Sequence, residues 1–285
     1  MQGAQPSQTA MQVAAARAAH RRYDPPPHIL EDDRAEGLLG DAAVELIPRY
    51  SDENAPLVSL ENRLFIPLRA RYAEDRLAEA YRAGVRQLVV LGAGLDSYAF
   101  RKPAEQSALC VYEVDHPSTQ GWKTDRIAAL GWEIPEALHF VPCDFESTRV
   151  SEALQATSFD TSAPSVVTWM GVTYYLEPET AFRALVDLHE ILAPQSEVVL
   201  DYQYPFEDLP PRYDGLREAM KTYLSDVGEP QMNRYRREAL RKVILEAGYR
   251  EALFPEAEDL YERYFAPLDT QITMSGRLAL AVACR

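Results

Sequence analysis

An apolar run that leads straight into two glycines offers the clearest chemistry in this sequence. Residues 88–91 are continuously apolar and partly β-branched, as in a strand covered on both faces, and Gly92 and Gly94 follow at once. Glycines here allow a tight turn with no side chain between the backbone and a ligand. A pyrophosphate fingerprint needs a third small residue for close helix packing; the sequence has Ser97, and the preceding Asp96 would repel a phosphate. The loop therefore favours a cationic or zwitterionic nucleotide-type cofactor.

Two carboxylates follow these glycines at a spacing of about twenty residues. Residues 108–114 form a second predicted strand, which carries Glu113 and ends next to Asp115. An acid at the tip of the second strand holds ribose hydroxyls in dinucleotide-binding folds, and any adenosyl cofactor offers the same hydroxyls. We therefore expect Glu113 and Asp115 to contact a ribose.

A further acid lies at the end of the next predicted strand. Residues 139–143 are followed by Asp144 and Phe145, an acceptor and an apolar ring that suit the amino group and the face of an adenine. The alternative is structural, because an Asp ahead of Glu146 and Ser147 could equally cap a following helix.

The order of these motifs resembles that of the leucine carboxyl methyltransferase family. The segments that carry the resemblance are Arg69-Ala-Arg71-Tyr72, Leu91-Gly92-Ala93-Gly94-Leu95-Asp96, Glu113-Val-Asp115-His-Pro117, Cys143-Asp144-Phe145 and Gly171-Val-Thr-Tyr-Tyr175-Leu-Glu-Pro178. The likeness extends back to Thr9 and covers nearly the whole chain. Members of this family use S-adenosylmethionine, and they include protein C-terminal carboxyl methyltransferases and bacterial small-molecule enzymes of polyketide pathways. This sequence is more similar to the bacterial branch.

The resemblance gives Arg69 a role that suits its chemistry. In the family, the arginine at this position receives the carboxylate of the cofactor's amino-acid tail, and a guanidinium supplies two parallel donors for such a group. Arg71 lies two residues further on, thus on a different helix face, and is expected to pair with Asp75.

The sequence departs from the family at Met170, where a glutamate usually receives the cofactor's ammonium group. Backbone carbonyls around Trp169 and Met170 could accept that hydrogen bond instead. The Trp169 ring could also face the sulfonium through a cation–π attraction of roughly 0.5 to 2 kcal/mol. The departure leaves a non-catalytic cofactor-binding module open as an alternative.

Tyrosines are prominent in the segments expected to hold the acceptor. Tyr175 matches the family tyrosine, and Tyr174 stands beside it. Either hydroxyl could orient an acceptor oxygen, and the alternative is that these tyrosines only pack as part of the wall. Tyr202 ends a predicted strand and Tyr204 opens a Tyr- and Pro-rich stretch, and both are expected to contact the acceptor as well.

None of the histidines stands out as a general base. His189 falls within a predicted helix and is expected to pack there, and His116 is expected to edge the adenosine pocket. His20 and His28 lie in the predicted N-terminal cap and are the better candidates. The lack of a convincing base favours a carboxylate acceptor, which is ionised at neutral pH, over a hydroxyl.

Composition excludes several classes of partner. The chain of 285 residues carries a formal charge of -15, from 44 acids against 29 bases, which would repel the phosphate backbone of DNA or RNA. No signal-peptide pattern opens it and no apolar run approaches the length of a membrane span, so we expect a cytoplasmic protein without membrane contact. Its three scattered cysteines fit free thiols better than a disulfide or a zinc site, and no metal is expected.

Strand and helix patterns alternate along the chain and predict an α/β fold. The resemblance implies a Rossmann-like, doubly wound sheet of seven strands, as in class I methyltransferases. Residues 1–84 are expected to form a helical cap and residues 85–285 a cofactor-binding core, together one compact domain. An insertion at 203–247 is expected to cover the carboxyl ends of the strands as a substrate lid. Its alternative role is contact within a homodimer.

Individual elements can be placed on the same grounds. An amphipathic helix is predicted at 8–22, with alanines on one side and arginines on the other, and a longer helix at 60–83 is expected to break near Pro67. The remaining strands are predicted at 165–170, 197–202, 249–254 and 272–284, and the last two are expected to pair antiparallel at an edge.

The sequence thus predicts an S-adenosylmethionine-dependent O-methyltransferase that acts on a carboxyl or hydroxyl group of a small aromatic or polyketide-like molecule. Methylation of a protein C-terminus and non-catalytic cofactor binding remain as alternatives. The glycines taken alone would also allow an NAD-dependent oxidoreductase, against which Asp96 and Ser97 count.

Overall fold

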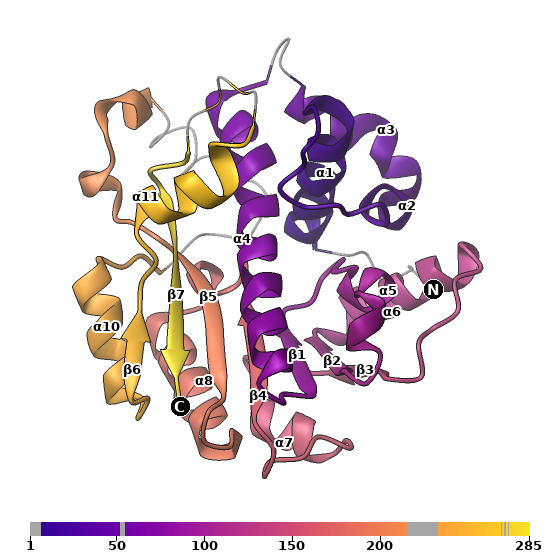
Figure 1. The fold of residues 1–285 in the computed structure, drawn as a ribbon, viewed down its shortest axis with the longest axis vertical. Helices are drawn as coiled ribbons and strands as arrows, with labels where there is room; N and C mark the ends of the chain where they lie inside the picture. Colours follow the sequence, from indigo (N-terminus) through magenta and orange to yellow (C-terminus); the bar gives the residue numbers. More distant parts are fainter. Residues whose placement is uncertain (1–6, 52–54, 216–232, 269, 271, 273) are drawn as a thin grey trace.

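A sheet of seven strands forms the centre of the described part of the chain (Figure 1). The computed structural model describes residues 7–51, 55–215, 233–268, 270, 272 and 274–285. The strand order is β3-β2-β1-β4-β5-β7-β6, and β7 runs antiparallel to both of its neighbours. The strands are β1 (Gln87–Leu91), β2 (Cys110–Asp115), β3 (Leu138–Pro142), β4 (Ser165–Trp169), β5 (Glu197–Gln203), β6 (Glu251–Leu253) and β7 (Leu278–Cys284). The predicted α/β fold with a seven-stranded sheet is confirmed.

Helices connect these strands and precede them. They are α1 (Gln8–Tyr23), α2 (Ala35–Leu39), α3 (Ala43–Leu46), α4 (Leu57–Arg82), α5 (Tyr98–Arg101), α6 (Pro117–Ala129), α7 (Val150–Gln155), α8 (Pro178–Ile191), α10 (Arg237–Glu246) and α11 (Ala257–Leu260), with a short 3-10 turn η4 (Thr173–Tyr175) after β4. Pro117 and Pro178 stand at the first positions of α6 and α8, as predicted, where a residue without an N–H loses no helical hydrogen bond.

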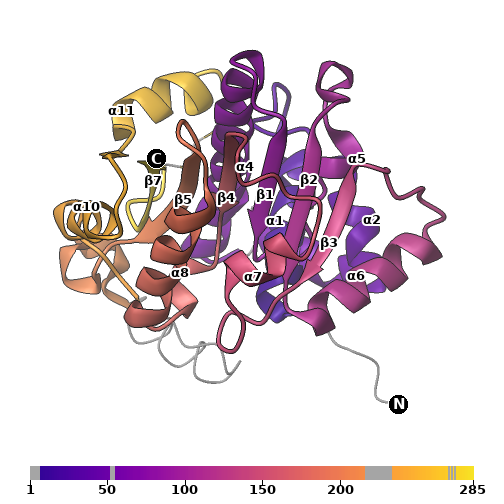
Figure 2. The same ribbon diagram turned by 90° about the horizontal axis from the view of Figure 1, so that it is seen from below.

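Successive side chains of β1 serve two different hydrophobic cores. Leu88 and Val90 pack with α4 and α5, whereas Val89 and Leu91 face the core built with α7, α8 and α10. All five residues of β1 are buried, as expected of a parallel strand covered on both faces. Figure 2 shows α7, α8 and α10 on one side of the sheet and α4 on the other.

The helices α1, α2 and α3 gather beside the glycine-rich loop after β1 and pack on it through Leu95 (Figure 1). The small alanines of α1 are buried and let it lie close to α4. The predicted separation of alanines from solvated arginines is wrong at Arg17, which is buried. Its guanidinium donates to Asp32 at 2.7 Å and to the carbonyl of Leu95 at 2.6 Å, and these partners compensate for its loss of water.

The helix α4 is continuous through Pro67, so the predicted interruption is wrong. A proline inside a helix removes one backbone hydrogen bond and crowds the preceding turn. Leu64, Phe65 and Leu68 around it are buried against the C-terminal part of the chain, and tertiary packing of this kind contributes most of a helix's stability.

The C-terminal strands pair antiparallel as predicted, with β7 between β5 and β6 so that β6 forms the edge. Of the predicted lid at 203–247, residues 216–232 lie outside the described residues, and α10 in the described part packs into the core beside α8. Within the described ranges, no helix is both long enough and apolar enough to cross a membrane.

Candidate functional site

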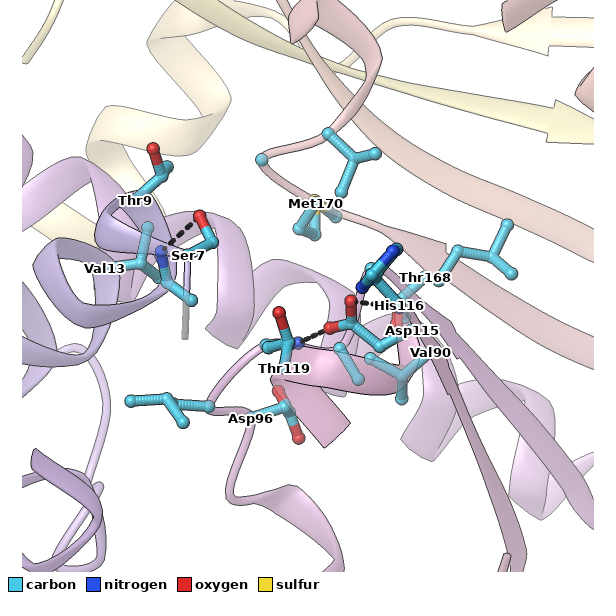
Figure 3. A pocket seen from close by; sticks show the side chains of 18 of the residues that line it. Ser7, Thr9, Val13, Val90, Asp96, Asp115, His116, Thr119, Thr168 and Met170 are labelled. Atoms are coloured by element: carbon cyan, nitrogen blue, oxygen red, sulfur yellow. Dashed lines mark hydrogen bonds between the residues drawn. The ribbon is translucent and has the colours of Figure 1, made fainter. Parts of the chain in front are cut away.

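A cavity of about 760 Å³ lies at the carboxyl ends of β1, β2 and β4, beneath the start of α1 and beside α4. Its volume falls in the range of small-molecule sites. Figure 3 shows Ser7, Thr9 and Val13 on one side of the cavity and Asp115 and His116 on the other. The N-terminal helix therefore closes a site that the strand ends open, as open α/β sheets generally place it.

Gly92 and Gly94 shape the floor of this cavity. Their φ angles are 62° and 51°, in the left-handed region that side chains other than glycine's rarely adopt. A Cβ on Gly92 would lie 2.3 Å from a methyl of Val172, and one on Gly94 would lie 3.1 Å from Ala10. The two glycines therefore allow the walls of the cavity to close around the loop, in addition to exposing its backbone. Ala93, between them, lines the cavity too.

The loop is a poor pyrophosphate site, as predicted from Asp96. The following helix α5 has only four residues, and the Asp96 carboxylate accepts a hydrogen bond at 2.8 Å from the N–H of Tyr98 at its start. Pyrophosphates bind to free N–H groups at the start of a longer helix. The geometry counts against the NAD-dependent oxidoreductase reading.

Of the two acids on β2, the structure brings only Asp115 to the cavity. Its carboxylate accepts hydrogen bonds from the N–H groups of Gly94 and His116, and burial raises its pKa. Glu113 lies deeper along the strand and forms an ion pair with Lys123 of α6, and it does not line the cavity. Burial raises the pKa of Glu113 to about 7, although Lys123 opposes the shift. The expected ribose contact of Glu113 is therefore not supported.

Asp144 and Phe145 both line the cavity beyond β3. The Asp144 carboxylate also accepts hydrogen bonds at 3.0 Å from the N–H of Glu146 and the hydroxyl of Ser147, and these bonds lower its pKa. The helix cap considered as the alternative is not present, because these bonds close a turn and α7 begins later, with Arg149 as its N-cap. The same side chain remains available at the cavity wall.

Arg69 reaches the cavity from α4, opposite the glycine-rich loop. Its Nη1 donates to the Tyr174 hydroxyl at 3.0 Å and to the carboxylate of Asp201 on β5. Burial alone would lower the pKa of Arg69, but Asp201 and Tyr174 outweigh burial and raise it, so the guanidinium stays charged. The predicted pair of Arg71 with Asp75 is confirmed, at 2.8 Å.

Thr168 and Met170 line the cavity, and Trp169 between them does not. Side chains alternate along a strand, so the Trp169 ring points into the core on the other face, where it is fully buried. The cation–π contact proposed for Trp169 is therefore not supported. Met170 itself offers a thioether where the family has a carboxylate.

Among the tyrosines expected at the acceptor, the structure brings Tyr175 to the cavity. Tyr174 turns away and uses its hydroxyl on Arg69. Tyr202 and Tyr204 lie outside the cavity, with their hydroxyls 3.3 Å apart, and Tyr202 packs edge-on against Phe254. Acceptor contacts by these three are not supported, because β5 aims Tyr202 into the hydrophobic core.

Among the histidines in the part of the chain that the structure describes, His116 lines the cavity. Its side chain caps α6. His20 is fully buried, with Nδ1 2.8 Å from Asp24 and Nε2 accepting from the N–H of Ile29. His189 packs against Tyr249 as predicted. His20 is thus occupied on both nitrogens, away from the cavity.

Three charged residues at the cavity were not expected there from the sequence: Arg17, Glu74 and Glu146. Arg17 and Glu74 belong to a buried network in which Arg17, Ser97 and Arg101 contact Asp32, and Arg101 also binds Glu74. Burial would raise the pKa of Asp32, but the two arginines outweigh it and hold the pKa below its usual value. The network ties α1 and Asp32 to the glycine-rich loop.

The cysteines Cys110, Cys143 and Cys284 are free thiols. The described residues contain no group of three or more His, Cys, Asp or Glu side chains placed to hold a metal ion.

The strand order arranges the cavity residues in a line. Along β3, β2, β1 and β4 come the Asp144–Phe145 pair, then Asp115, then the open backbone at Gly94, and then Arg69 beside the end of β4. This order matches the parts of S-adenosylmethionine. Asp144 and Phe145 suit the amino group and face of the adenine, and Asp115 suits the ribose hydroxyls. The backbone at Gly94, which carries no side chain, corresponds to the sulfur, and the cation of Arg69 to the carboxylate. The residues present therefore fit that cofactor.

Comparison with known proteins relates the chain to one family. A family model described as leucine carboxyl methyltransferase matches residues 10–188. The Bacillus subtilis protein YktD, whose name proposes S-adenosyl-L-methionine-dependent methyl transfer, is 32% identical over 216 residues, which cover 69% of this chain and 70% of YktD. A Mycobacterium relative (strain KMS) with the same proposed activity is 33% identical over 206 residues, covering 68% of this chain and 65% of its own. The chain thus spans about two thirds of the length of these relatives.

Solved structures support the fold. A DUF574 family protein from Streptomyces avermitilis superimposes with a TM-score of 0.58 at 13% identity, covering 99% of this chain and 98% of its own. A proposed methyltransferase from Thermobifida fusca gives 0.57 at 14% identity, covering 100% of this chain and 96% of its own. At such identities the likeness concerns the fold.

Proposed function

The chain belongs to the leucine carboxyl methyltransferase family of S-adenosylmethionine-dependent methyltransferases, and we propose that it methylates a carboxyl or hydroxyl oxygen of a small molecule. The observation that carries this proposal is that the start of α1 and the segment after β4 both line the cavity. They contribute an apolar part of its wall, with Ala10 and Val13 from α1 and Val172 and Leu176 from either side of η4. Such a wall suits an aromatic or polyketide-like acceptor better than a peptide tail, which needs an open groove.

The residues of the chain would act mainly by alignment. The bound cofactor supplies a methyl group on a positively charged sulfur. Arg69 would hold its carboxylate, Asp115 its ribose, and Asp144 with Phe145 its adenine. Holding two reactants in line for displacement is worth roughly 7 to 11 kcal/mol.

Tyr175 is the residue that we assign to the acceptor. It follows Met170 along the same wall, and its phenol can donate a hydrogen bond to an acceptor oxygen. His116, the histidine of the described wall, lies on the ribose side next to Asp115. A carboxylate acceptor, already ionised at neutral pH, would need no base. We therefore favour a carboxylic acid over an alcohol within this proposal.

The test is mass spectrometry of a metabolite extract incubated with the protein and a deuterated-methyl cofactor. We expect a small-molecule product that carries the labelled methyl and is released by mild alkali if it is an ester. Label that appears only in the protein fraction would favour a protein C-terminal carboxyl methyltransferase. A protein that binds S-adenosylhomocysteine but labels no compound in either fraction would favour the non-catalytic module.

A further inference from the structure

The carboxylate of Asp201 joins three elements beside the cavity without lining it. Asp201 lies near the end of β5 and is fully buried. One of its oxygens accepts from Arg69 Nη1 and, at 3.5 Å, from the Tyr174 hydroxyl; the other accepts from the N–H of Gly171 at 2.7 Å. Its backbone carbonyl accepts from the Thr173 hydroxyl at 2.8 Å. This one residue therefore fixes both the loop after β4 and the arginine of α4.

The position of Asp201 relates it to the missing family glutamate. Leu200 pairs with Trp169 across β4 and β5, so Asp201 stands on β5 level with Met170 on β4. An acid is thus present one strand away from the position where the family has one. Because Asp201 is buried and absent from the cavity wall, it is not placed to receive an ammonium group of a ligand there.

The pair of Arg69 with Asp201 leaves donors of the guanidinium for a ligand. Among the described residues, the hydrogen bonds of the Arg69 guanidinium, to Tyr174 and Asp201, are both made by its Nη1. Arg69 and Gly171 both line the cavity, and Nη2 is the atom of Arg69 nearest to this glycine, at 2.8 Å from a Cβ built on it. A guanidinium held through one nitrogen keeps an edge with parallel donors for a second carboxylate.

We propose that Asp201 is a positioning residue for the cofactor's amino-acid tail: it holds Arg69 by one nitrogen and turns the other edge of the guanidinium into the cavity. The inference rests on the assignment of Arg69 to the cofactor's carboxylate. It means that this chain, with Met170 in place of the glutamate, recognises the tail mainly by its carboxylate. A buried guanidinium without a partner is costly, so Arg69 would leave this orientation if Asp201 lost its charge.

Calorimetric titration with two ligands tests this role. S-adenosylhomocysteine carries the amino-acid tail, whereas 5′-methylthioadenosine has the same adenosine and sulfur without it. In Asp201→Asn, we expect the affinity for S-adenosylhomocysteine to fall about 10- to 100-fold, by analogy with the loss found when hydrogen-bond partners of metal ligands are removed. The affinity for 5′-methylthioadenosine should change by less than about threefold, within the worth of one neutral hydrogen bond.

Asp187→Asn is the matched control. Asp187 is a buried acid of α8 that accepts hydrogen bonds from Ser151 at 2.8 Å and 2.5 Å and from Arg149 at 2.8 Å, and it does not line the cavity. It should leave the affinities for both ligands unchanged. If Asp201→Asn does not fold, Tyr174→Phe removes a weaker partner of the same Nη1, and it should lower S-adenosylhomocysteine affinity alone by about two- to tenfold.

Three outcomes would overturn the proposal. An equal fall for both ligands would make Asp201 a structural residue. An unchanged or higher affinity for S-adenosylhomocysteine would show that the charge of Asp201 merely offsets that of Arg69. A wild-type protein that binds S-adenosylhomocysteine no better than 5′-methylthioadenosine would remove the role of Arg69 itself. None of these depends on acceptor methylation, so a failure to find a methylated product would count against the proposed function alone.

Discussion

Two buried ion pairs, each between an acid of a strand and a base of a helix, differ in what they leave free. Glu113 of β2 and Lys123 of α6 are paired away from the cavity, and Lys123 offers a compact ammonium whose charge is already matched. Arg69 of α4 lines the cavity and is held there by Asp201 of β5, which does not line it, and the forked guanidinium retains donors beyond the one that Asp201 holds. Both pairs are buried and charged. They differ in that the guanidinium of Arg69 keeps hydrogen-bond donors for a ligand in the cavity, and this is the feature that indicates a ligand site.

Breaking the Glu113–Lys123 pair, which has no donor open to the cavity, should have the largest effect, namely a loss of unfolding free energy. Lys123→Met leaves Glu113 buried without its partner, which costs about 3–5 kcal/mol in comparable cases. Urea denaturation should show this loss of unfolding free energy. The ratio of affinities for S-adenosylhomocysteine and 5′-methylthioadenosine should stay as in wild type. A changed ratio would place this pair in the cofactor site after all.

Breaking the Asp201–Arg69 pair from its arginine side should affect binding as well as stability, because Asp201 is then also buried without its partner. Arg69→Met removes the cation proposed for the cofactor's carboxylate, and losing a buried, charge-paired contact of this kind costs about 100-fold in affinity. Calorimetry should show that loss for S-adenosylhomocysteine and almost none for 5′-methylthioadenosine. Comparable losses for the two ligands would mean that Arg69 only supports the fold.

The Glu113–Lys123 pair should also make the unfolding free energy depend on pH. Burial raises the pKa of Glu113 from 4.5 to about 7, so between these values the folded protein holds a proton that the unfolded chain has released. The unfolding free energy should therefore fall as pH rises through this window, by at most about 1.4 kcal/mol per pH unit from this group. Glu113→Gln should flatten the profile measured by urea denaturation. A variant whose profile keeps the wild-type slope would contradict this origin.

The smallest effect is expected at the acceptor wall. Tyr175→Phe should lower kcat/KM for the acceptor about two- to tenfold, the worth of one hydrogen bond, without changing S-adenosylhomocysteine affinity. Tyr202→Phe serves as its control, because the Tyr202 hydroxyl lies outside the cavity, and it should leave both quantities unchanged. If Tyr202→Phe proves the more damaging variant, the acceptor lies nearer β5 than we propose.

Local sequence patterns were sufficient for one half of the site. The apolar run of β1, the glycines at 92 and 94 and the acid at 115 lie within a short stretch, and each has a conformational or chemical reason that is visible without the fold. The structure places Gly92, Gly94 and Asp115 at one cavity. Glu113 carries the same charge two residues earlier, and only the packing of α6 over it separates the two acids.

The other half depends on contacts that no local pattern contains. Asp201 and Arg69 are separated by 132 positions, and a single acid in an apolar strand gives no indication of its partner. Trp169 and Met170 differ by one residue, and the alternation of side chains along β4 decides which of them reaches the cavity. Arg17 was expected on the arginine side of an amphipathic helix. Its buried position depends on its partner Asp32, which comes from a loop whose position cannot be read from the sequence.

A crystal structure with S-adenosylhomocysteine bound would test the central claim most directly. We predict the ligand in the cavity at the strand ends, with its carboxylate on the free edge of Arg69, its ribose hydroxyls on Asp115 and its adenine beside Asp144 and Phe145. Density for the ligand elsewhere, or with its tail directed away from Arg69, would contradict the account.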